Sequence, residues 1–128
     1  MNTCNFISQL ISQQDNIIKK CENNAIIAVD DFKPLFIKQK KMFISLQSIL
    51  TITLDFLSNE MNKEKYNELM VNMMNEYNII LFEYLEVLNQ LVQINMINEN
   101  QYIEYCNDTK KEKGLMDMVL HICTMLKT

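Results

Sequence analysis

Apolar side chains recur at alternating steps of four and three residues through the middle of the chain. Steps of this size place side chains on one stripe of an α-helix. A second apolar row widens the stripe beyond the seam of a two-stranded coiled coil, so several neighbouring helices are expected. The first row is Tyr66, Met70, Met73, Tyr77, Ile80, Tyr84, Val87, Leu91 and Ile94, and the second is Leu69, Leu81, Leu85, Leu88 and Val92.

The pattern predicts one long central helix over about 63–95, and Asn75 and Asn78 flank a point at which it can break. Helical spacing also predicts an earlier helix over about 3–21. Asp30 and Asp31, followed by Pro34, are typical of a helix start, and this helix should run to about residue 57. The apolar run 25–29 fits either a helical turn or a buried link.

The last third of the chain contains two patterns typical of capping boxes, Asn98–Gln101 and Thr109–Glu112. Each predicts a helix start, so a short helix should precede a final one that ends near residue 126. The segment 94–102 also resembles the segment 57–66, with a helix end, a polar turn, an acidic helix start and a tyrosine in the same order. Two hairpins built alike would explain the likeness, and so would the common sequence preferences of helix starts.

Composition supports an all-α fold. The 128 residues include one glycine and one proline, which leaves few positions for the tight turns of a sheet. Net charge is −4 and 48% of the residues are hydrophobic, as expected of a folded globule. We therefore predict a compact bundle of four to six helices in a single domain over residues 1–128. No long apolar run interrupts this pattern, so no membrane span is expected.

All twelve basic residues are lysines. Without arginine the chain lacks the planar, two-pronged donor that recognises guanine and phosphate, and its overall charge is acidic, so nucleic-acid binding is unlikely. The high asparagine and isoleucine content is typical of an AT-rich genome, such as that of some viruses, phages or bacteria.

Four cysteines stand far apart with no C-x-x-C pair: Cys4, Cys21, Cys106 and Cys123. Without a recognisable leader, this spacing favours reduced thiols and a cytoplasmic location, which for a viral protein is the host cytosol.

The residues needed for catalysis are scarce. The sequence has a single histidine, His121, which permits at most one histidine-based nucleophile system, and no nucleophile signature such as G-x-S-x-G surrounds any serine. Its single glycine, Gly114, leaves no glycine-rich phosphate loop. Asp117 lies four residues before His121 and could form half of a metal site, although a solvent-facing histidine explains it better. Glu76, Glu83 and Glu86 fit a solvated helix edge. We expect no enzymatic activity, no cofactor and no metal.

Ten methionines offer a different kind of function. Flexible thioethers suit surfaces that adapt to a partner helix, although most of these methionines have the spacing of core residues. Five residues lie partly off the main stripes and are the predicted protein-binding patch: Met74, Phe82, Tyr105, Met118 and Met125.

The resulting hypothesis is a non-enzymatic interaction module. It would bind another protein, such as an amphipathic helix, through an apolar face or groove with an acidic rim, as a small viral or phage-type inhibitor of a host protein would do. Two alternatives stay open from the sequence: a small acidic chaperone for secretion or assembly, and a structural subunit that associates with itself, for instance as a homodimer.

Overall fold

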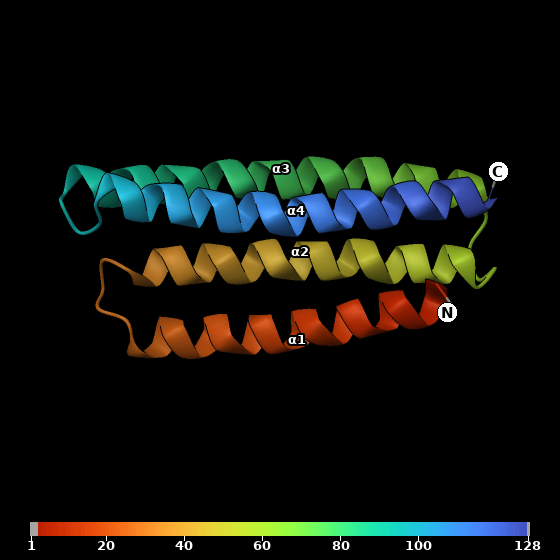
Figure 1. Ribbon diagram of the computed structural model, residues 1–128, viewed down its shortest axis with the longest axis horizontal. Helices are drawn as coiled ribbons and strands as arrows, with labels where there is room; N and C mark the ends of the chain where they lie inside the picture. The colour runs from red at the N-terminus through yellow and green to blue at the C-terminus, as the bar shows by residue number, and fades with distance from the viewer. Residues whose placement is uncertain (1–2, 128) are drawn as a thin grey trace.

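The computed structural model describes residues 3–127; in the last helix it describes side chains up to Lys111 and those of Lys113, Gly114, Asp117 and His121. These residues form four antiparallel helices and no strand (Figure 1). In chain order they are α1 (Thr3–Ile27), α2 (Lys33–Leu57), α3 (Lys63–Gln93) and α4 (Glu99–Lys127). The all-α prediction is confirmed. None of the described helices is both long and apolar enough to cross a membrane.

The central position belongs to α2, although α3 is the longest helix at 31 residues. Figure 1 shows α1 on one side of α2 and the pair α3 and α4 on the other. Among the described residues, α1 packs almost entirely against α2, whereas α2 also contacts α3 and α4. The bundle is therefore open, because α1 does not close it against the second pair of helices.

Helix α3 confirms the heptad pattern and runs without a break through residues 75–78. Tyr77 and Tyr84 are fully buried, and Leu88 from the second row is also fully buried. Ile94 is the exception, since it follows the last helical residue and is 55% exposed. The helix ends before the apolar pattern does.

The core consists of three clusters of buried side chains, and each cluster includes residues of α2. The largest joins α2, α3 and the turn before α4, with Leu35, Met42, Leu46, Ile49, Tyr77, Tyr84, Leu88, Leu91 and Ile97. A smaller cluster of Ile7, Leu10 and Leu50 holds α1 against α2. In the third, the rings of Phe56 and Tyr66 stack with their centroids 4.3 Å apart.

Asparagine takes the place of glycine where α2 and α3 end. Asn59 and Asn95 both adopt φ of 62°, a left-handed conformation that asparagine tolerates better than most residues. The backbone N–H groups that follow them donate back into the helix, from Glu60 to Asp55 and from Met96 to Leu91, both at 2.9 Å. Both ends are Schellman motifs.

The same asparagine chemistry starts the next helices. The side chain of Asn62 accepts a hydrogen bond from the Lys65 N–H at 2.8 Å. Asn98 and Gln101 form the predicted capping box, each side chain accepting from the backbone N–H of the other, at 2.8 and 2.9 Å.

Two expected helix boundaries are wrong. Helix α1 continues six residues beyond position 21, to Ile27, and so includes the first three residues of the apolar run 25–29. The Thr109–Glu112 pattern starts no helix, and α4 runs through it. Thr109 is buried and its hydroxyl donates to the Tyr105 carbonyl one turn earlier, at 3.1 Å, so it is not available as a cap.

Candidate protein-binding surfaces

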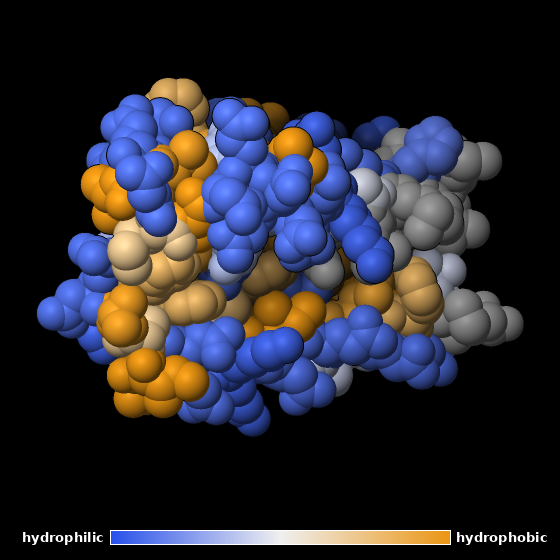
Figure 2. Space-filling view, turned by 60° about the vertical axis from the view of Figure 1, so that its left-hand side comes forward, coloured by the Kyte–Doolittle hydropathy of each residue, from blue (hydrophilic) through white to orange (hydrophobic). Residues whose placement is uncertain are grey.

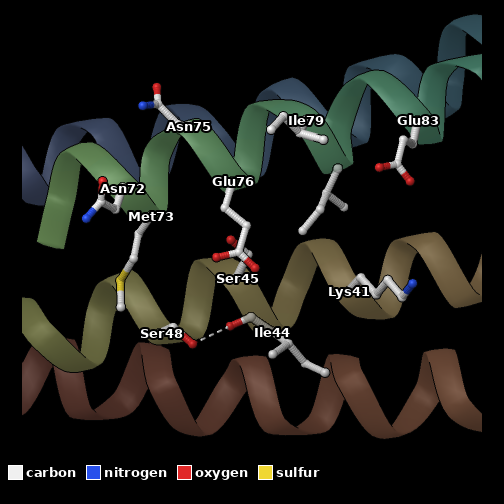
Figure 3. Close-up of a pocket in the computed structure, with 11 residues that line it drawn as sticks. Lys41, Ile44, Ser45, Ser48, Asn72, Met73, Asn75, Glu76, Ile79 and Glu83 are labelled. Carbon is white, nitrogen blue, oxygen red and sulfur yellow. Dashed lines mark hydrogen bonds between the residues drawn. The ribbon is translucent and has the colours of Figure 1, made fainter.

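A groove of about 710 Å³ runs between α2 and α3 on the side away from α4 (Figure 3). Its α2 wall includes Lys41, Ile44 and Ser48, and its α3 wall includes Asn72, Glu76, Ile79 and Glu83. In Figure 3, Glu76 points from α3 toward Ser45 on α2, and Lys41 and Glu83 lie together at one end. The groove thus combines isoleucine and methionine side chains with charges of both signs.

Charge is divided between the two walls. Among the residues that line the groove, Lys41 on α2 is basic, and Glu76 and Glu83 on α3 are acidic. Lys40 instead forms an ion pair with Glu22 on α1, at 3.1 Å. Lys38 forms an ion pair with Glu83 across the groove, and the hydrogen bond from Lys38 lowers the pKa of the Glu83 carboxyl. Lys41 is exposed on the same wall. One wall is therefore basic and the other acidic.

The outer face of α3 exposes three large apolar side chains. Val71, Ile79 and Phe82 are 61%, 62% and 65% exposed. They share one side of the helix, whose exposed polar positions include Glu68, Glu76 and Glu86. A hydrophobic strip with an acidic rim is typical of a protein-binding surface.

Of the five residues of the predicted patch, three have side chains that the structure describes, and among these only Phe82 is exposed. Phe82 lies on this outer strip, whereas Met74 and Tyr105 are half-buried and pack against the main core. Met118 and Met125 lie outside the described side chains. Val71 and Ile79 were missed, although both lie off the two predicted apolar rows, which is the signal that could have found them.

A second group of exposed apolar side chains lies at one end of the molecule. The turns α1–α2 and α3–α4 meet this end, at the left of Figure 1, and Figure 2 shows hydrophobic colour gathered there. Ile26, Ile27 and Val29 come from the first turn region, and Ile94 and Met96 from the second. The apolar run 25–29 was the sequence signal for this feature.

A second hollow, of about 380 Å³, lies between α3 and α4. It has Leu81, Leu85 and Tyr102 on its apolar side and Lys110 and Lys113 at its edge. Cys106 also lines it and raises the pKa of the Tyr102 hydroxyl.

Among the described side chains, no group of three or more histidine, cysteine, aspartate or glutamate residues is placed to hold a metal ion. Asp117 and His121 are both exposed. Cys21 and Cys106 are free thiols, and burial raises the pKa of Cys21, which keeps it protonated and unreactive.

Comparison of the chain with protein-family models, with curated proteins and with solved structures finds no match. Function must therefore be argued from the surfaces themselves.

Proposed function

We propose that this protein is a non-enzymatic binding module whose outer α3 face holds a basic amphipathic helix of another protein. The observation that carries the proposal is the exposed strip of Val71, Ile79 and Phe82. Positions 71 and 82 are eleven residues apart, or about 16 Å along the helix, which matches the reach of two to three turns of a bound helix.

Phe82 is the natural anchor of such an interface. Aromatic side chains supply much of the binding energy where they enter a pocket of the partner and lose contact with water. The acidic residues Glu68, Glu76 and Glu86 would attract lysine or arginine on the flanks of the bound helix and speed its association. An inhibitor of viral or phage type could use this surface against a host protein in a reducing compartment.

Affinity capture with paired variants tests the proposal. Phe82→Glu should abolish capture of partner proteins that the native chain retains from a cell lysate, with a loss of at least tenfold, because a buried aromatic anchor is worth about 2 kcal/mol or more. Asn89→Glu is the matched control, since Asn89 is exposed on the same side of α3 but beyond the strip.

Both substitutions are at exposed positions, so the free energy of unfolding should change by no more than about 0.5 kcal/mol. Crosslinks from the captured proteins should map to α3. If native protein and the Phe82→Glu variant retain the same proteins in the same amounts, this function is wrong.

A further inference from the structure

We propose that the groove between α2 and α3 is an interface with a second copy of this chain, related by a two-fold axis that runs along the groove. This interface shares Ile79 with the outer strip of α3 but leaves Val71 and Phe82 outside it, and it goes beyond the function proposed above. Two features support this interface: the division of charge between the two walls, and the position, or level, of each residue along the groove.

A two-fold rotation about the groove exchanges its walls. The α2 wall of one copy then lies over the α3 wall of the other, and each residue keeps its level along the axis. The basic wall of each copy consequently faces the acidic wall of its partner. A single self-complementary surface of this kind satisfies the requirement for a closed dimer.

The levels of individual residues match. The Lys38–Glu83 ion pair shows which parts of the antiparallel helices lie side by side. In Figure 3, Lys41 and Glu83 lie at one position along the groove, on opposite walls, and Ile44 and Ile79 lie at another. After the rotation, Lys41 faces Glu83 of the second copy, and Ile44 faces Ile79 of the second copy. Ile44 and Ile79, 40% and 62% exposed in one chain, would be covered.

The available area suits a dimer of modest affinity. Helix α2 has 25 residues and is about 37 Å long, and two helices packed side by side present a face about 19 Å wide. The product of about 700 Å² is the most that this face can bury, because the groove residues cover only 41–48 of α2 and 72–83 of α3. It is below the 800 Å² or so that each partner buries in a standard interface. Because polar and charged groups contribute much of this area, we expect a dissociation constant in the micromolar range.

Phe82 stays outside this interface. It is one residue from Glu83, and consecutive helical positions point about 100° apart, which turns Phe82 toward the outer face. The dimer would thus cover Ile79 and leave Val71 and Phe82 of the outer strip open on each copy.

A charge-exchange experiment tests the pairing, with sedimentation or light scattering of the full chain over a range of concentrations. Lys41→Glu should place two acidic groups together on each side of the two-fold axis, and Glu83→Lys two basic groups. Each variant alone should dimerise about tenfold or more weakly than the native chain. Mixing the two variants should restore dimerisation, because every contact then joins opposite charges.

Matched controls exclude general charge effects. Glu86→Lys adds the same charge to α3 one turn outside the groove, and Lys20→Glu removes the same charge on α1, so both should dimerise as the native chain does. Circular dichroism verifies that each variant is folded, which matters for Glu83→Lys because it removes the pair with Lys38.

Three results would overturn the interface: a chain that stays monomeric up to about 1 mM, a dimer that neither single substitution weakens, or a mixture that fails to restore association. These results leave the outer strip untouched, and the Phe82→Glu variant should still form the dimer. Failure of this inference is therefore distinguishable from failure of the proposed function.

Discussion

Tyr84 shows how a single buried side chain links the helices. Its hydroxyl accepts a hydrogen bond from the Gln39 side chain on α2 at 3.2 Å, and its ring lies in the main cluster. Burial, more than any neighbouring charge, raises the pKa of Tyr84 to about 12. The protonated tyrosine is thus favoured in the folded state.

This shift predicts a specific pH dependence. The ordinary pKa of tyrosine is about 10, so the unfolded chain ionises first, and Tyr84 should withdraw about 2 to 3 kcal/mol of stability between pH 10 and 12. At neutral pH, Tyr84→Phe should lower the free energy of unfolding by about 1 kcal/mol through loss of the hydrogen bond. In alkaline solution this deficit should vanish and reverse.

Urea unfolding of both proteins from pH 7 to pH 12 measures the difference directly. The two proteins share every other ionisable group, and only the native chain can ionise at position 84. A difference in the free energy of unfolding that stays constant from pH 7 to pH 12 would therefore contradict the assigned cause.

At the scale of the element, the two turns that follow α2 and α3 use the same chemistry. Asn59 and Asn95 supply the left-handed residue, and Asn62 and Asn98 supply the next N-cap. The likeness of the segments 57–66 and 94–102 is therefore a likeness of structure as well as sequence. Shared helix-end chemistry is sufficient to explain it.

The left-handed asparagines yield a graded prediction. Asn95→Ala should lower the free energy of unfolding by about 1 kcal/mol, because a Cβ without a local polar partner strains this backbone conformation. Asn95→Gly should stay within about 0.5 kcal/mol of the native chain, since relief of strain offsets the greater freedom of the unfolded state.

Denaturant titration of these two variants beside Asn100→Ala, an exposed position inside the first turn of α4, provides the comparison. Equal effects of alanine at positions 95 and 100 would mean that the left-handed conformation carries no cost.

The sequence was sufficient for helix type and for the buried stripe of α3, because spacing alone fixes which side chains share a face. It was not sufficient for helix ends in the apolar run 25–29 or at Thr109. At these positions the same residues can cap a helix or lie inside one, and packing against the neighbouring helices determines which of the two occurs. The outer strip was only partly predicted, through Phe82, because periodicity does not reveal that α1 leaves α3 uncovered.

For the whole molecule, the main consequence of the open bundle is unequal stability. Helix α1 is held by a small cluster along α2, whereas α2 and α3 share the largest cluster. Segments with fewer buried apolar contacts open locally at lower free energy.

We therefore expect backbone amides of α1 to exchange with deuterium faster than those of α2 and α3. Leu10→Ala should cost about 2 to 3 kcal/mol and accelerate exchange mainly in α1. Leu88→Ala, at a fully buried site in the largest cluster, should cost about 3 to 5 kcal/mol and accelerate exchange throughout.

Mass-spectrometric exchange on the native chain and both variants resolves the helices separately. Identical protection of α1 and α3 in the native chain would show that the molecule opens as one unit.

The even number of antiparallel helices also governs how the protein can be handled. Helix α1 begins and α4 ends at the same end of the molecule, and the aliphatic turns around Ile27 and Ile94 lie at the opposite end (Figure 1). A tag or bead attached at either terminus would hold every molecule in one orientation, with those turns facing the solution. Immobilised protein would expose the same apolar end to the solution, whichever terminus is attached.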